Sequence, residues 1–134
     1  MGAHYSQPIR VYIEDTDAGG IVYYVNYLKF MERARTELLR SLGYAKTAIF
    51  SEELMFVVHS TQIKYLSPAR LDESLDATAT VIKTGRSYMV FAQSVTRDGT
   101  LLCEATVKIA CVHQQTMQPT RIPQPMLEAL AKKH

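Results

Sequence analysis

The sequence predicts an α+β fold in which an antiparallel sheet of five strands wraps around one long central helix. Two observations carry this prediction. Apolar residues recur at steps of three and four across residues 24–42, which is the period of an amphipathic helix. The segments on either side alternate apolar and polar residues, or are rich in β-branched and aromatic residues, as strands are. A helix and a meander of strands pack well as two layers, with the sheet curled over the apolar face of the helix.

The first elements are a leader, a strand and the helix. Residues 1–6 are expected to form a flexible leader. Residues 9–14 alternate between apolar and polar side chains, which predicts a half-buried strand with Asp15 near its end. The helix is predicted over residues 24–42, and Gly43 stands where a residue that ends a helix is common.

Four further strands are predicted after the helix, joined by tight turns that make the sheet antiparallel. Asp98-Gly99 is a two-residue hairpin signal between the last two strands, and residues 84–87 form a similar turn between the preceding two. Residues 47–53 are expected to be one or two helical turns or a loop. Residues 123–134 are expected to be a C-terminal extension or a short helix, and the whole chain, 1–134, a single domain. The four strands are predicted at residues 55–66, 75–82, 88–96 and 101–113.

The composition narrows the classes of function. The formal net charge is +2 and there is no arginine-rich run, so no nucleic-acid partner is expected. No apolar run approaches the roughly 20 residues of a membrane-spanning helix, so no transmembrane segment is expected. No signal peptide is expected, because the first residues lack a charged segment followed by an apolar one. The expected location is the cytoplasm, with attachment at the periphery of the inner membrane as the alternative.

The cysteine and histidine residues indicate neither a disulfide nor a metal site. Cys103 and Cys111 fall in one predicted strand, about 26 Å apart along it. A disulfide spans only about 5.5 Å between Cα atoms, so both residues are expected to pack in the core. No histidine stands at ligand spacing from another histidine or a cysteine, and His59 and His113 are expected to be structural. Neither a metal nor another cofactor is therefore expected.

The stretch from Asp15 to Tyr27 holds the candidate site. Two acidic residues, Asp15 and Asp17, precede Gly19-Gly20, and the helical pattern starts shortly afterwards. Glycine allows a substrate to approach the backbone closely, and the first N–H groups of a helix lack partners within the helix. A carboxylate beside such N–H groups suits attack on a carbonyl whose oxygen becomes negative. The alternative is a tight acidic turn in which Asp17 caps the helix.

The residues from Arg10 to Tyr27 resemble the signature of the 4-hydroxybenzoyl-CoA thioesterase family. Within that family, the chain is most similar to the acyl-CoA thioesterases encoded with the bacterial Tol-Pal system, the YbgC type. The resemblance extends to about Pro123 and implies a hotdog fold. One residue departs from it, because most members of that branch carry histidine where this chain has Tyr24. The likeness lies in Arg10-Val11, Thr16-Asp17, Gly20-Ile21-Val22, Tyr23, Tyr24 and Tyr27, and continues in residues 30–37 and 65–72.

The resemblance implies roles for individual residues. Asp17 is implied as the catalytic carboxylate, acting as nucleophile or general base, with Asp15 as its competitor. The backbone N–H of Tyr24 is implied as the donor to the oxyanion, while the Tyr24 ring either lines the pocket or fills the core. Coenzyme A also needs basic groups for its phosphates, for which Lys83 and Lys108 are further candidates. The residues implied in substrate binding are Gly20, Ile21, Val22, Tyr23, Tyr27, Lys64, Arg86 and Ser87.

The implied activity is hydrolysis of the thioester of a short- to medium-chain or aromatic acyl-CoA, without a metal or other cofactor. The implied assembly is a homotetramer, a dimer of dimers, and acyl carrier protein is a further candidate partner. Two alternatives stay open. One is a hotdog dehydratase acting on acyl-carrier-protein substrates. The other is a non-catalytic acyl-binding or scaffold protein associated with the Tol-Pal envelope machinery.

Overall fold

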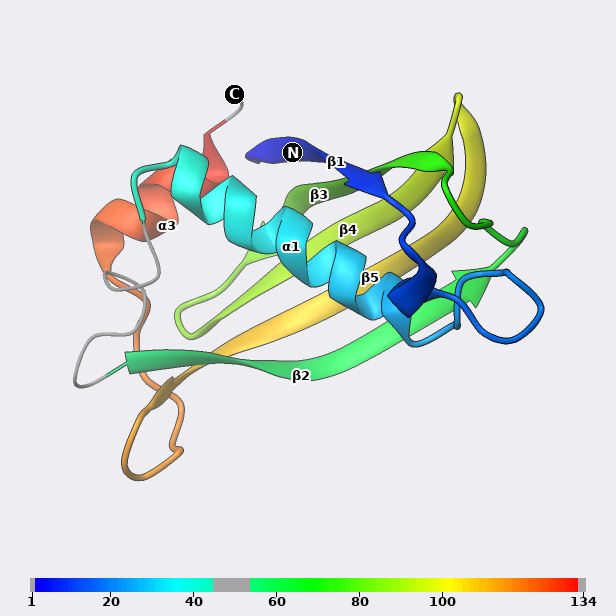
Figure 1. Cartoon of the computed structure of the whole chain (residues 1–134). Helices are drawn as coiled ribbons and strands as arrows, with labels where there is room; N and C mark the ends of the chain where they lie inside the picture. The colour runs from blue at the N-terminus through cyan, green and yellow to red at the C-terminus, as the bar shows by residue number, and fades with distance from the viewer. Residues whose placement is uncertain (1, 45–53, 133–134) are drawn as a thin grey trace.

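The computed structural model describes residues 2–44 and 54–132. In these residues, an antiparallel sheet of five strands curves around the helix α1 (Asn26–Ser41), as Figure 1 shows. The strands lie in the order β1-β3-β4-β5-β2, so β1 and β2 form the two edges. The predicted α+β architecture is confirmed. The strands are β1 (His4–Arg10), β2 (Leu54–Tyr65), β3 (Ser74–Thr84), β4 (Tyr88–Arg97) and β5 (Thr100–His113).

Helix α1 buries its apolar stripe against one face of the sheet. Phe30, Met31, Ala34 and Leu38 recur at helical spacing and have no exposed surface. Each large apolar side chain buried in this way stabilises the fold by about 1.5–3 kcal/mol. Both ends of α1 lie within two residues of the predicted helix, which is confirmed.

The strands after the helix are confirmed as well. At the turn between β4 and β5, Asp98 has φ 50° and Gly99 has φ 81°, the pair of left-handed conformations that a two-residue type I′ hairpin requires. On β3, Ala77 and Ala79 are fully buried where the strand contacts α1, and their small side chains let the helix approach closely.

The N-terminal residues are not the flexible leader that the sequence predicts. Residues 4–6 belong to β1, which pairs with β3. Ala3 is 1% exposed, and its N–H donates to the Leu130 carbonyl in helix α3 (Gln124–Ala131) at 2.9 Å. A Cβ at Gly2 would collide with the same carbonyl. The packing of this segment depends on residues at the far end of the chain.

The first strand also ends earlier than predicted. It stops at Arg10, and Ile13, expected on its buried face, is 76% exposed in the short 3-10 helix η1 (Ile13–Asp15). The Tyr12 N–H donates to the Asp15 carboxylate at 2.9 Å. Such a local side-chain bond competes with strand pairing and turns the chain out of the sheet.

The two remaining segments have different outcomes. The C-terminal short helix is present as α3. The prediction for residues 47–53 lies outside the described residues. None of the helices in the described part of the chain is long and apolar enough to cross a membrane.

Candidate active site

Residues 16–22 form a tight turn that presents Asp17 to solvent. The Asp17 N–H donates to the Ile21 carbonyl at 2.9 Å, and Gly20 adopts φ 79°, a conformation that favours glycine. The Asp17 carboxylate accepts the Gly19 N–H at 2.8 Å through Oδ1. Asp17 therefore caps its own turn, and the N-cap of α1 is Val25, which has no side-chain cap bond. Its second oxygen, Oδ2, has no partner among the described residues and is free to meet a substrate or a water.

Asp15, the competing carboxylate, is buried and has a structural role. It is 6% exposed, and both of its oxygens accept hydrogen bonds. Oδ2 accepts the Tyr12 N–H and Oδ1 accepts Nδ2 of Asn26, each at 2.9 Å. These contacts leave Asp17 as the accessible acidic side chain of the pair. Asn26 is absent from the sequence-based set of site residues; the only signal for it is a short polar side chain in the first turn of an apolar helix face.

The Tyr24 N–H is an open hydrogen-bond donor at the start of α1. The Tyr23 N–H before it donates to the Asp15 carbonyl at 2.9 Å, and the Asn26 N–H after it donates to the Tyr23 carbonyl at 2.8 Å. Within residues 2–44 and 54–132, no acceptor bonds the Tyr24 N–H. Tyr24 lies one residue before Val25, the N-cap of α1, so its N–H is close to the helix end that carries partial positive charge. The arrangement can therefore stabilise a developing oxyanion.

Three exposed tyrosine rings lie next to this donor. The Tyr24 and Tyr23 rings are 5.0 Å apart between centroids, and Tyr24 meets the Tyr65 ring edge-on at 6.0 Å. The Tyr65 hydroxyl donates to the Tyr24 carbonyl at 3.2 Å, which ties β2 to the helix start. Tyr24 is 58% exposed, so the alternative that its ring fills the core is wrong.

Other residues of the predicted set lie behind these rings. Tyr27 is 3% exposed, its ring reaches Tyr65 at 5.6 Å, and its hydroxyl accepts the Ala69 N–H at 3.0 Å. Burial raises the pKa of Tyr27 above its ordinary value. Val22 is buried and donates its N–H to the Ala69 carbonyl, while Ile21 is half-buried. These residues support the site from inside the core.

Arg86 and Ser87 lie at the opposite end of the sheet. They occupy the turn between β3 and β4, whereas the segment carrying Asp17 packs near the start of β3, about one strand length away (Figure 1). In this turn, the Arg86 and Ser87 carbonyls accept backbone N–H groups, and the Arg86 side chain is exposed. One chain therefore does not bring Arg86 to Asp17.

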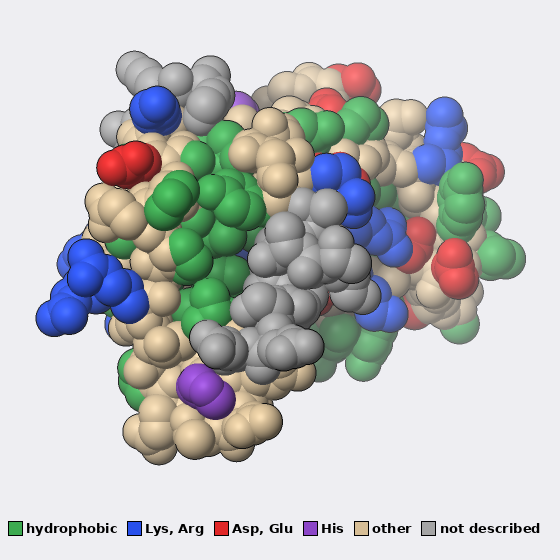
Figure 2. Space-filling view, turned by 90° about the vertical axis from the view of Figure 1, so that its left-hand side faces the viewer, with side chains coloured by type: hydrophobic (Ala, Val, Ile, Leu, Met, Phe, Trp, Pro, Cys, Tyr) green, Lys and Arg blue, Asp and Glu red, His purple; other side chains and the backbone are tan. Residues whose placement is uncertain are grey.

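Basic side chains are available at the Arg86 end. The ammonium groups of Lys83 and Lys108 lie 5.9 and 4.5 Å from the centroid of the Tyr88 ring. Figure 2, which views the molecule from its left-hand side in Figure 1, shows Lys and Arg side chains in several separate groups among acidic and uncharged ones. This face can supply cations to phosphate groups without forming one continuous basic surface.

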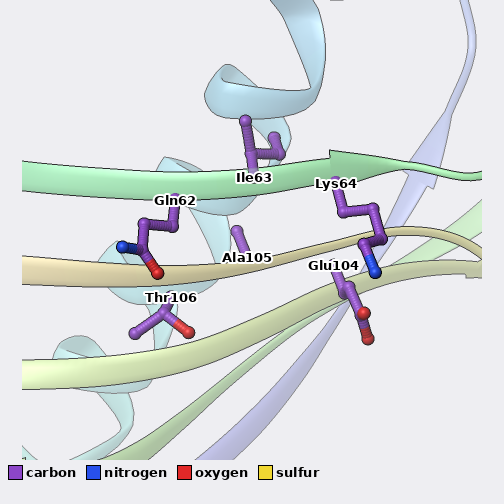
Figure 3. Close-up of a pocket in the computed structure, with 6 residues that line it drawn as sticks. All are labelled: Gln62, Ile63, Lys64, Glu104, Ala105 and Thr106. Carbon is purple, nitrogen blue, oxygen red and sulfur yellow. The ribbon is translucent and has the colours of Figure 1, made fainter.

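Lys64 lies on the other face of the sheet from α1. It borders a hollow of about 460 Å³ over β2 and β5, where it pairs in register with Glu104 and Gln62 pairs with Thr106. Figure 3 shows Ile63 pointing toward α1 and Lys64 pointing away from it. Within one chain, Lys64 and the Tyr24 N–H are therefore separated by the sheet.

The cysteines pack in the core, as predicted. Cys103 and Cys111 are both free and fully buried. Burial raises the pKa of the Cys103 thiol to about 12. A thiol with that pKa is not a competent nucleophile near neutral pH. Across residues 2–44 and 54–132, no group of three or more His, Cys, Asp or Glu side chains is placed to hold a metal ion.

Comparison with known families identifies the class of protein. The thioesterase-like superfamily matches residues 11–130. The chain belongs to this superfamily and is a thioesterase, as its sequence motif predicts.

Two relatives are similar along most of the chain, which confirms the resemblance to the YbgC type. The acyl-CoA thioester hydrolase YbgC of Escherichia coli is 42% identical over 117 residues, covering 87% of each chain. The acyl-CoA thioesterase YbgC of Haemophilus influenzae is 43% identical over 120 residues, covering 89% of this chain and 88% of the relative.

Solved structures confirm the hotdog fold. A probable thioesterase from Bartonella henselae superposes with a TM-score of 0.86 at 32% identity, covering 90% of this chain and all of that one. A 1,4-dihydroxy-2-naphthoyl-CoA thioesterase from Synechocystis has a TM-score of 0.87 at 21% identity, with 94% of each chain covered, and shares the fold.

Proposed function

We propose that this chain hydrolyses the thioester bond of acyl-CoA, with Asp17 as the catalytic carboxylate and the Tyr24 N–H as the oxyanion donor. The Tyr24 N–H carries the proposal, because a helix-start donor with no acceptor among the described residues is what a developing oxyanion needs. The exposed Asp17 carboxylate, with one free oxygen, supports it. The activities named for the Escherichia coli and Haemophilus influenzae relatives support acyl-CoA as the substrate class.

Asp17 can act in either of two ways. As a general base, it takes a proton from a water whose oxygen attacks the thioester carbon. As a nucleophile, its own oxygen attacks, and water then hydrolyses the resulting mixed anhydride. In both cases the carbon–sulfur bond breaks, coenzyme A leaves as the thiol after taking up a proton, and no metal or other cofactor takes part.

The tyrosines beside the Tyr24 N–H suit a short- to medium-chain or aromatic acyl group. The Tyr23, Tyr24 and Tyr65 rings offer exposed apolar faces next to the proposed oxyanion donor. Aromatic rings bury large areas and pack edge-on or offset against other rings. Acyl carrier protein remains a second candidate carrier, because it holds acyl groups through the same thioester linkage.

Assembly would complete the site. Strand β2 is an edge whose outer side pairs with no other described strand, and long edge strands are commonly covered. Two copies joined along β2 by a two-fold axis would set the 84–87 turn of one at the same end of the joined sheet as Asp17 of the other, because these features lie at opposite ends of the sheet in one chain. Arg86 of the partner subunit would then reach a phosphate of coenzyme A, with Ser87 of the partner subunit beside it. Two such dimers would form the proposed homotetramer.

Release of free thiol from a panel of acyl-CoAs tests the proposal. Asp17→Asn keeps the shape of the side chain and removes its charge, so turnover is expected to fall by about 10²–10⁴-fold. Asp76→Asn, at another exposed carboxylate on β3, is the matched control and should keep the parent rate. A chelator should leave the rate unchanged. Hydrolysis by folded Asp17→Asn at the parent rate would show that Asp17 is not the catalytic group.

A further inference from the structure

The backbone of Tyr23, the residue directly before the proposed oxyanion donor, is part of a closed ring of hydrogen bonds with Asp15 and Asn26. We propose that Asp15 and Asn26 are positioning residues that aim the Tyr24 N–H at the oxyanion. This inference rests on the proposed function of that N–H, and it adds two residues that do not themselves touch the substrate.

The first step is the geometry of one peptide unit. The Tyr24 N–H and the Tyr23 carbonyl belong to the same planar unit, and the described chain has no cis peptide bonds. In a trans unit the N–H and C=O point in opposite directions. The Tyr23 carbonyl accepts the Asn26 N–H at 2.8 Å. The bond that fixes this carbonyl toward the helix therefore also fixes the Tyr24 N–H away from it.

The second step is the bond on the other side of Tyr23. The Tyr23 N–H donates to the Asp15 carbonyl at 2.9 Å. Tyr23 is thus tied to Asp15 through its N–H and to Asn26 through its carbonyl. Rotation of the Tyr23–Tyr24 peptide unit would break at least one of these bonds.

The third step joins the two ties through side chains. Asp15 Oδ1 accepts Nδ2 of Asn26 at 2.9 Å, and Oδ2 accepts the Tyr12 N–H at 2.9 Å. Asp15 and Asn26 are only 6% and 7% exposed, so water does not compete strongly for these bonds. Hydrogen bonds to an ionised carboxylate are also among the stronger ones. The side-chain bond holds η1 to the first turn of α1 and closes the ring around Tyr23.

A reciprocal exchange of the two side chains tests the inference. Asp15→Asn alone places the new amide N–H against either the Tyr12 N–H or Nδ2 of Asn26, both of which are donors, so one bond is lost. Asn26→Asp alone places two carboxylates together. The double variant Asp15→Asn/Asn26→Asp restores both bonds, because the new amide can accept the Tyr12 N–H and donate to the new carboxylate. Such a double-mutant cycle isolates the coupling between the two side chains.

Two measurements are made on the three variants. Removing an oxyanion donor completely costs about 10²–10³-fold in kcat, and a misaimed donor loses part of that. Each single variant should therefore lower kcat by about 10–100-fold, with KM changed less than about threefold, because the interaction is made only in the transition state. The double variant should return to within about tenfold of the parent kcat. Amide hydrogen exchange of Tyr23 should be about tenfold faster in the single variants and slow again in the double variant.

The outcomes separate this inference from the proposed function. Gln93→Leu, which disturbs α1 far from its start, is the control for general destabilisation and should change kcat less than threefold. Parent-like kcat in single variants whose Tyr23 amide exchanges faster would overturn the inference and leave the proposed function standing. Unchanged Tyr23 exchange in the single variants, or a folded double variant without recovery, would also overturn it. Absence of hydrolysis by the parent would refute the proposed function together with the catalytic role of this pair, while Tyr23 exchange would still report whether the ring forms.

Discussion

Replacing Gln93 with leucine is expected to destabilise the fold by about 2–4 kcal/mol. Gln93 stands on β4 beneath the middle of α1 and is 3% exposed. Its Nε2 donates to the Met31 carbonyl at 2.9 Å and to the Thr78 carbonyl at 3.1 Å. Its Oε1 accepts Nη1 of Arg35 at 2.8 Å. One amide therefore links the helix, β3 and a guanidinium.

The magnitude follows from these three bonds. A neutral hydrogen bond contributes about 0.5–1.5 kcal/mol net, and one to a charged group about 1.5–3 kcal/mol. Leucine recovers part of the loss through its buried apolar surface. The remaining cost falls on Arg35, because burial already lowers the pKa of its guanidinium and the variant removes its acceptor. An unpaired charge in a poorly hydrated place is expensive.

Urea unfolding followed by circular dichroism measures the effect, at one protein concentration because the proposed assembly would also contribute to stability. The double variant Gln93→Leu/Arg35→Leu removes both partners and should regain at least half of the loss. A single variant within about 0.5 kcal/mol of the parent would show that the Gln93 bonds contribute little net stability. A double variant as unstable as the sum of the two single ones would show that Arg35 and Gln93 act independently.

Three further predictions follow from the proposed site and the buried thiols. Arg86→Ala should raise KM more than it lowers kcat, because a phosphate contact far from the thioester is equal in ground and transition states; a substrate without the nucleotide should be indifferent to the change. Light scattering at micromolar concentration should give the mass of four chains, and the mass of one chain would refute the assembly. Iodoacetamide at pH 8 should modify Cys103 only very slowly in the folded protein, because a thiol pKa of about 12 leaves almost no thiolate, and rapid loss of this thiol would contradict its burial.

The main helices and strands could be predicted because local residue periodicity and turn residues specify them. The step of three and four across α1 and the Asp98-Gly99 turn each act within a few residues. The N-terminal segment could not be predicted in this way. Ala3 is held by Leu130, which no local pattern reveals. Where the sequence predicts a strand through Ile13, the chain forms η1, in which the Tyr12 N–H bonds the Asp15 carboxylate and the Asp15 N–H bonds the Tyr12 carbonyl.

The same distinction between local and distant determinants applies to the residues of the candidate site. Asp17 and Tyr24 lie within one contiguous motif, and the structure places the Asp17 carboxylate in an exposed turn and the Tyr24 N–H at the helix start. Lys64 could have been assigned to the other face from the sequence, because Ile63 is its apolar neighbour and successive side chains of a strand alternate. Asn26 could not, since its importance depends on the burial of its partner, Asp15.

The resemblance implies histidine at the position of Tyr24 in most YbgC-type members, and a tyrosine there is compatible with the proposed chemistry because the proposed donor is a backbone group. Tyr24 is 58% exposed and its ring contacts the Tyr23 and Tyr65 rings, whereas the N–H is fixed by the bonds on either side of Tyr23. Any residue except proline supplies that N–H, so the side chain at this position can change without loss of the donor. A tyrosine in place of that implied histidine would alter the surface next to the proposed thioester position, because a phenol would stand where an imidazole titrates near neutral pH. The proposed oxyanion donor and the proposed acyl-contacting surface at Tyr24 are therefore separable features of one residue, the first set by the backbone bonds of Tyr23 and the second by the side chain.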